Sequence, residues 1–276
     1  MKTKSFSCAV ALAVSLGTSF SYAQSVEELL GLTVPGMQSS TTPGDMGHVA
    51  AEESPFYFAI TVDPVVQGDI HIQDSTTSTN LGVNGNQIKF FPGVGVGLTL
   101  GYRIPDTYIV VQVSTGFLWS QVREFNGTLD VSGATSKLSE GSGHLYQIPV
   151  LVSPGLEFDL GDNWPFLHGS LIRFGPTVGV TYYDLAVDDI NRENSSTTYS
   201  FGRSNWAFAY GAFLSLDFFL TKNVALTIGY QFMGTASVNY GDLKSENGGQ
   251  FVSGGPDMKA NFTYVNIVKC GVSIYF

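Results

Sequence analysis

The chain has 276 residues, a formal net charge of −10 and only 13% charged residues. Its 13 basic residues leave no electrostatic footprint for nucleic acid, and without a long apolar run beyond the N-terminus it offers no transmembrane helix. Glycine (32 residues) and aromatic residues (13%) are abundant instead, so apolar surface must be hidden by alternation along β-strands.

Residues 1–23 have the pattern of a cleaved secretory signal. Lys2 and Lys4 provide a positive start, an apolar core covers 8–16, and Ala23 ends a small-residue cleavage site. The exported chain keeps a single cysteine, so no intramolecular disulfide can form.

Residues 24–54 differ from the rest of the chain, because the stretch after Pro35 is rich in Ser, Thr, Gly and Pro. We expect a flexible segment ahead of the strands. A plug or lid over the nearby mouth of the strand domain is the alternative.

Alternation of bulky apolar residues with small or polar ones marks eight strand candidates after residue 54. They span 55–73, 88–103, 108–122, 144–160, 166–187, 205–220, 223–240 and 260–276. The second is the clearest, since Val94, Val96 and Leu98 alternate with Gly95 and Gly97. An uninterrupted bulky face opposite a small or polar face is typical of a barrel with an apolar exterior. The sequence therefore predicts that 55–276 is an all-β, antiparallel, eight-stranded transmembrane up-and-down β-barrel.

The connections between these strands alternate strictly between short and long. The short ones lie near 105–106, 161–163 and 221–222, and the long polar ones span 74–87, 123–143, 188–204 and 241–259. Aromatic residues gather near both ends of the strands, where rings sit at the headgroup level of a bilayer. With an even number of strands, both ends of the domain fall on one side of the membrane.

The last strand carries the most specific signal. Lys269 and Gly271 occupy one face, Ile274 the other, and the aromatic Phe276 ends the chain. Together with the export signal, this resembles the closing strand of a Gram-negative outer-membrane barrel, which the barrel-assembly machinery recognises. The pattern over 55–276 resembles the small eight-stranded barrels of the OmpX, OmpW and OmpA-barrel type.

This resemblance implies a monomer in the outer membrane, with residues 24–54 in the periplasm. Its expected partners are outer-membrane lipid, lipopolysaccharide and the assembly machinery, and neither nucleic acid nor a cofactor is implied.

Five charged residues are expected on the inward faces, since a charge facing lipid costs about 2–4 kcal/mol. They are Glu157, Asp159, Arg173, Asp217 and Lys269. Because both signs occur, we expect ion pairs that fill a narrow interior; a selectivity filter is the alternative. The glycine face of the second strand leaves room for a small cavity.

Five prolines fall inside predicted strands, where each removes a donor from the ladder. They are Pro64, Pro92, Pro149, Pro154 and Pro176. Pairing about a turn near residue 163 would place Pro149 almost opposite Pro176, close to the outer-leaflet interface. A ladder weakened there would open sideways to lipid, which resembles PagP and the lateral exit proposed for OmpW. Bulges that curve the hairpins are the alternative.

One pair of residues has the types that catalysis needs. His168 lies two residues before Ser170, which resembles the catalytic pair of outer-membrane lipases and of the lipid A deacylase PagL. The pair falls at the periplasmic rim and lacks an acidic residue to orient the ring, so we predict no catalytic site. His48, His71 and His144 lack metal-ligand spacing, so no metal site is predicted either.

The sequence thus favours a non-enzymatic integral outer-membrane barrel whose loops serve envelope structure or surface interaction. The alternative is a narrow channel for small hydrophobic molecules with a lateral opening near Pro149 and Pro176. A lipid-modifying enzyme, resting on His168 and Ser170, is the third hypothesis.

Overall fold

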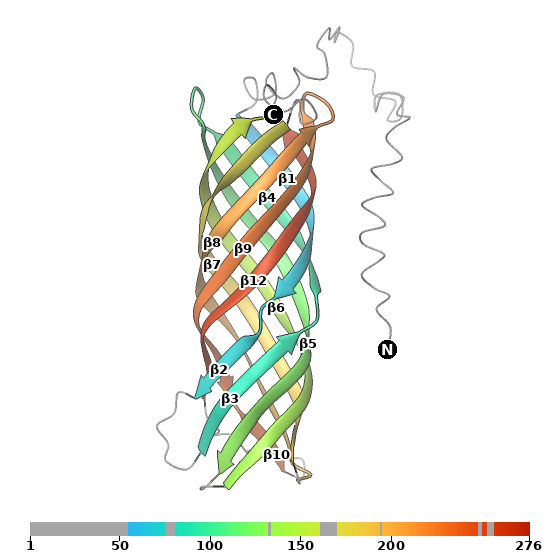
Figure 1. Cartoon of the computed structure of the whole chain (residues 1–276), viewed down its shortest axis with the longest axis vertical. Helices are drawn as coiled ribbons and strands as arrows, with labels where there is room; N and C mark the ends of the chain where they lie inside the picture. The colour runs from blue at the N-terminus through green and yellow to red at the C-terminus, as the bar shows by residue number, and fades with distance from the viewer. Residues whose placement is uncertain are drawn as a thin grey trace, which may run out of the picture. The chain divides into compact units, whose positions relative to one another are not determined.

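A computed structural model of the chain describes residues 55–74, 81–131, 134–160, 170–193, 195–247, 250–252 and 257–276. These residues form an antiparallel, all-β structure (Figure 1). The strands are β1 (Phe56–Gln67), β2 (Ile70–Asp74), β3 (Leu81–Phe90), β4 (Gly93–Arg103), β5 (Ile109–Val131), β6 (Ala134–Asp159), β7 (Ser170–Arg192), β8 (Thr198–Phe219), β9 (Val224–Asp242), β10 (Lys244–Asn247), β11 (Gln250–Val252) and β12 (Asp257–Tyr275).

Eight strands close into a ring. β1 pairs with β4, and β4 to β9 pair in sequence order. β12 closes the ring by pairing with both β9 and β1. β2 and β3 continue the first hairpin, while β10 and β11 extend the wall beside β8. The predicted eight-stranded antiparallel up-and-down barrel is therefore confirmed.

Both termini of this ring lie at one end, beside the turn between β8 and β9. The backbone N–H of Phe276 donates to the carbonyl of Phe56 (3.0 Å), and that of Tyr275 donates to the carbonyl of Asn223 in the β8–β9 turn (2.8 Å). At the opposite end lie β2, β3 and β10 (Figure 1). An even-stranded ring with this arrangement has its chain ends on one side of the bilayer.

The strands are longer than the sequence predicts. β5 has 23 residues and β6 has 26, so most of the expected polar loop 123–143 is a paired hairpin. The expected loop 188–204 likewise belongs largely to β7 and β8, and 241–259 contains β10 and β11. The first two predicted strands, by contrast, are each broken in two, at 68–69 and at 91–92.

Near the termini, the ring has an apolar exterior; we call this the proximal section. It comprises β1, β4 and residues 109–119, 146–159, 170–182, 206–219, 224–234 and 262–275. Its exposed side chains are mainly large and apolar: Ile60, Val62, Val66, Val94, Val96, Leu98, Leu100, Val113, Phe117, Ile148, Val150, Val152, Val178, Val180, Phe208, Leu214, Leu226, Ile228, Val268, Val272 and Ile274. The same strands turn polar residues and glycines inward, together with large side chains such as Tyr57, Leu118 and Met233. The predicted outward direction of the bulky apolar faces is therefore confirmed, whereas the small or polar inner face holds only in part.

Farther from the termini, the two faces exchange character; we call this the distal section. It comprises β2, β3 and residues 120–131, 134–145, 183–192, 198–205, 235–242 and 257–261. Its interior is an apolar core in which Phe125, Leu138 and Leu185 are fully buried. Its exterior carries exposed Arg123, Lys137, Asp188 and Arg203. The distal section therefore has the surface of a protein in water, and the proximal section has that of a protein in lipid.

Candidate functional site in the barrel interior and wall

A network of buried charges crosses the interior of the proximal section. Arg173 of β7 is 1% exposed, and its guanidinium pairs with Asp217 of β8. Its Nε also lies 3.8 Å from Oε2 of Glu157 on β6, which in turn pairs with Arg103 at the end of β4. Two arginines and two carboxylates balance, so the network as a whole is neutral. Each charge lies beside an opposite charge inside the ring, which is a condition for burying it.

Two tyrosines complete this network. The hydroxyl of Tyr275 donates to Asp217, and the hydroxyl of Tyr57 donates to Oε1 of Gln112 (2.7 Å). The Arg173 guanidinium lies over the Tyr57 ring, 4.0 Å from its centroid. Both rings are 2% exposed, so they seal the interior around the charges.

A second pair of charges lies higher in the proximal section. The register from Val62↔Cys270 to Val65↔Ile267 places Asp63 of β1 opposite Lys269 of β12. Asp63 is 2% exposed, and its Oδ1 has no hydrogen-bond partner among the described residues. Sequence analysis overlooked Asp63 and Arg103, although Asp63 follows Ala59 and Thr61 at inward positions of the alternation.

Of the five charges expected inside, Glu157, Arg173 and Asp217 come together in the network. Lys269 is half-buried on the inward face of β12. Asp159 shares the face of buried Leu171, its partner on β7, but it ends β6 and is exposed at the rim.

The room that the glycines of β4 would leave is already taken. A Cβ at Gly101 would lie 2.0 Å from the Tyr57 ring, and one at Gly97 would lie 2.5 Å from Oγ1 of Thr61. A cavity of about 30 Å³ lies between Tyr57, Arg173 and Lys269 among the described residues. That is about the volume of one water molecule in the liquid.

The distal interior is closed by apolar packing instead. Tyr183 and Tyr240 pack edge to face with ring centroids 5.5 Å apart, and the hydroxyl of Tyr183 donates to the carbonyl of Asn239 (3.1 Å). Burial raises the pKa of the Tyr240 phenol well above its ordinary value. The phenol therefore stays neutral at physiological pH, as an apolar core requires.

The prolines of β6 and β7 have different pairing partners from those expected. Leu156 pairs with Phe174 and Val152 with Val178, so the β6–β7 pairing centres on residue 165. This register puts Pro154 opposite Pro176, whereas Pro149 is opposite Thr181. The expected Pro149–Pro176 juxtaposition is wrong, because the pairing of β6 with β7 centres two residues later than the sequence suggested.

Only one of the remaining two prolines lies within a strand. Pro64 lies in β1 opposite Val94, and Pro92 lies in the break between β3 and β4. Both are exposed on the outside of the ring. Pro92 therefore falls where no ladder donor is needed.

The terminal strand has its expected two faces. Ile274 and Phe276 are exposed on the apolar exterior, and Phe276 stacks with Phe56 at a centroid distance of 6.3 Å. Gly271 is packed against β1, since a Cβ there would lie 1.9 Å from the carbonyl oxygen of Ile60.

The residues considered for chemistry do not assemble a site that the structure can describe. Ser170 begins β7, is 2% exposed and pairs with Phe218, while His168 and His48 lie outside the described residues. Among the described residues, no three His, Cys, Asp or Glu side chains lie together as metal ligands would. None of the described segments is a helix long and apolar enough to span a membrane.

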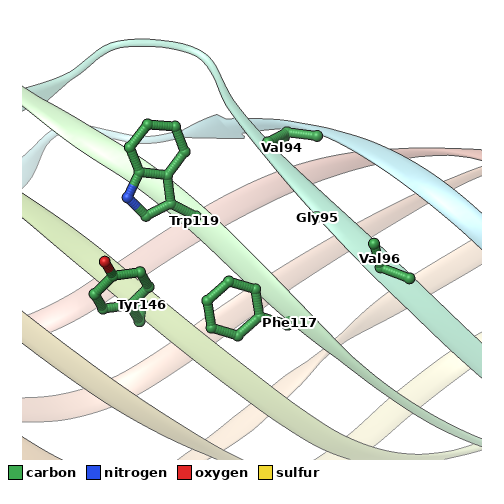
Figure 2. A pocket seen from close by; sticks show the side chains of 6 residues that line it. All are labelled: Val94, Gly95, Val96, Phe117, Trp119 and Tyr146. Carbon is green, nitrogen blue, oxygen red and sulfur yellow. The ribbon is translucent and has the colours of Figure 1, made fainter.

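The outer wall formed by the described residues carries an open hollow that the sequence alone does not indicate. This outer groove has a volume of about 450 Å³ and is lined by Val94, Gly95, Val96, Phe117, Trp119 and Tyr146. In Figure 2 the three rings, from β5 and β6, stand along one side and the two valines of β4 along the other. Trp119 pairs with both Val94 and Tyr146 in the ladders, so three adjacent strands form the groove.

No family model and no curated protein matches this sequence. Solved structures that match include the outer membrane protein OprG from Pseudomonas aeruginosa, which is 16% identical over 82% of this chain and 97% of that chain, with a TM-score of 0.41. The outer membrane protease OmpT from Escherichia coli is 7% identical over 82% and 97%, with a TM-score of 0.45. Ail, the attachment invasion locus protein of Yersinia pestis, is 12% identical over 81% and 99%, with a TM-score of 0.34.

Because these identities and TM-scores are low, the fold is assigned from the architecture of the chain itself. Its ring closes without a free edge, and its exterior near the termini is an apolar band. The described residues therefore form a small eight-stranded transmembrane β-barrel.

Proposed function

We propose that the protein is a non-enzymatic barrel with a closed interior, whose distal section projects from the outer membrane for envelope structure or surface interaction. The observation that carries the proposal is the filling of the ring at two levels. The Arg103–Glu157–Arg173–Asp217 network occupies the proximal interior, and the apolar core around Leu185 occupies the distal one.

The length of the strands supports this role. About 9–11 tilted residues cross the hydrocarbon of a bilayer, whereas β5 to β9 have 19 to 26 residues. The excess carries the polar exterior of the distal section into water, where it offers a rigid surface to other molecules. Export by the signal at 1–23, recognition of Lys269, Gly271, Ile274 and Phe276 by the barrel-assembly machinery, and a monomeric state belong to this proposal.

Conductance measurements in planar bilayers test the closed interior. The native protein is expected to give no resolvable single-channel current. Because the distal apolar core would still close the ring without the Tyr57 side chain, Tyr57→Ala should not conduct either, and insertion is checked separately by flotation of the protein with the lipid vesicles. Steady currents from the native protein would refute the closed interior.

A second candidate function is access of small hydrophobic molecules through the wall. It is favoured by the β6–β7 ladder, which is interrupted between Val152↔Val178 and Leu156↔Phe174, where Pro154 and Pro176 face each other. Uptake of an apolar fluorescent probe into proteoliposomes tests it. Pro154→Ala and Pro176→Ala together should slow the uptake if the break is the portal, and an unchanged rate would remove this candidate.

The distal hairpin of β9 and β12 gives the second candidate further support. β8 pairs with β9 only up to Ala209↔Thr235, and β12 leaves β1 at Gln67↔Val265 before meeting β2 at Gln73↔Lys259. Residues 236–242 and 257–264 are therefore paired mainly with each other. Because Tyr240 and Met258 of this hairpin belong to the apolar interior, its displacement would expose that interior.

A further inference from the structure

We propose that the outer groove, formed by Val94, Val96, Phe117, Trp119 and Tyr146, is a specific binding site for one acyl chain of lipopolysaccharide. The groove lies on the lipid-facing exterior and continues the apolar band, so hydrocarbon is the chemistry that its walls fit. This inference rests on the outer-membrane placement under the proposed function.

The position of the outer groove along the barrel axis indicates which leaflet of the membrane it faces. Val94 lies nine residues along β4 from Arg103, the residue at the terminal end of the ring. At about 3.3 Å per residue and a tilt of about 40°, that is roughly 23 Å, close to the full height of about 25 Å of an apolar band. The groove therefore opens at the upper boundary of the outer leaflet, which in a Gram-negative outer membrane consists of lipopolysaccharide.

Its walls provide more contact than the surrounding surface. A volume of about 450 Å³ falls in the range of small-ligand sites, about 300–1,000 Å³. Phe117 and Tyr146 stand with ring centroids 5.5 Å apart and form the wall on β5 and β6, while the short valines of β4 form the opposite wall. An acyl chain lying between them would touch protein on two sides, whereas a chain on the convex wall touches it on one.

The polar residues above the groove suit a headgroup rather than more hydrocarbon. Gln121 and His144 are paired directly above Trp119 and Tyr146, and the His144 ring lies 4.6 Å from that of Tyr146. Exposed Arg123 adds a cation, while nearby Lys89 is held by Glu124 at 3.6 Å. A hydrogen bond from Asn126 lowers the pKa of Glu124, so this carboxylate stays charged and balances one of the cations.

Carboxylates keep the charge above the groove close to neutral. Asp184, the ladder partner of Tyr146, lies beside it and accepts a hydrogen bond from Ser204 (2.9 Å). Affinity is therefore expected to come mainly from the chain in the groove and only secondarily from the headgroup.

Fluorescence quenching by brominated acyl chains tests the site, because Trp119 forms one wall. The sequence has three tryptophans, so Trp164→Phe with Trp206→Phe leaves Trp119 alone, and Trp119→Phe with Trp164→Phe leaves Trp206, which is exposed on the apolar exterior, as a control. Each variant is reconstituted in brominated phosphatidylcholine and titrated with unbrominated lipopolysaccharide. We expect lipopolysaccharide to relieve quenching of Trp119 at a mole fraction roughly tenfold lower than for Trp206, equivalent to about 1.4 kcal/mol of preference.

A groove-filling variant assigns the preference to the site. Val96→Phe in the Trp119 background should abolish it, whereas Val272→Phe, on the exterior of β12, should leave it intact. If lipopolysaccharide relieves the quenching of both tryptophans equally, the proposal is overturned, because Trp119 then contacts only bulk lipid. Relief of Trp119 by unbrominated phosphatidylcholine as readily as by lipopolysaccharide would also overturn it. If brominated lipid quenches neither tryptophan, the outer-membrane placement itself fails, which is a distinguishable result.

Discussion

Pro154 of β6 lies directly opposite Pro176 of β7, at the one register position where neither strand can donate a backbone hydrogen bond. The paired residues resume on both sides, at Val152↔Val178 and Leu156↔Phe174, without a shift in register. The hydroxyl of Ser153 donates to that of Thr177 (2.8 Å) inside the ring at the same level. A side-chain bond therefore bridges the place where the backbone ladder is interrupted.

Restoring both donors should tighten this part of the wall. In the double variant Pro154→Ala/Pro176→Ala, we expect amides within 153–155 and 175–177 to exchange hydrogen more slowly, because each new N–H gains an acceptor across the ladder. Hydrogen exchange of the protein in lipid nanodiscs measures this effect.

Pro64→Ala is the matched control, since Pro64 lies on another strand pair and should leave exchange between β6 and β7 unchanged. If native amides beside Pro154 are already as protected as those near Leu214↔Tyr230 in the unbroken β8–β9 ladder, the break has no effect on the dynamics of the wall.

Removing the central cation should be costly. Arg173→Met leaves Asp217 without its buried cation and Glu157 with Arg103 alone, so we expect a loss of about 3–5 kcal/mol in the free energy of unfolding. Urea unfolding in lipid vesicles measures this loss. Arg203→Met, at an exposed position of the distal section, should change it by less than about 0.5 kcal/mol. A loss below about 1 kcal/mol for Arg173→Met would mean that the network does not hold the charges as described.

The Tyr57 ring and Gly101 should be coupled. Gly101→Ala would place a methyl group within 2.0 Å of that ring, so we expect it to destabilise the barrel by about 1–3 kcal/mol through overpacking. In the Tyr57→Ala background the same change should cost almost nothing, because the ring is gone. Additive effects in this double-mutant cycle would contradict the packing of the tyrosine against the glycine.

The sequence predicted the ring well because the proximal strands obey one rule. Bulky residues such as Val94 and Leu226 alternate with small or polar ones, and the lipid outside makes that alternation strict. The distal strands alternate too, but with the faces exchanged. Phe125, Leu129 and Leu138 point inward at wide spacing among polar residues. Because these segments have no uninterrupted bulky face, their sequence pattern is that of polar loops.

The contacts inside the barrel could be predicted only in part, because they depend on how neighbouring strands are aligned. Parity along a strand indicates which residues face inward, but partners depend on the register between strands. A difference of two residues in the centre of the β6–β7 pairing is enough to place Pro149 opposite Thr181 and not opposite Pro176. The outer groove could not be found from one strand at all, since its walls come from β4, β5 and β6.

Nitroxide labels at two outward positions test the central claim, the exchange of faces between the two sections. With Cys270 replaced by serine and the protein in vesicles, a label at Leu226 should be relaxed by oxygen dissolved in the acyl chains, and a label at Arg203 by an aqueous nickel complex. A Leu226 label that responds to the aqueous reagent, or an Arg203 label that responds only to oxygen, would contradict a barrel whose proximal section lies in lipid and whose distal section stands in water.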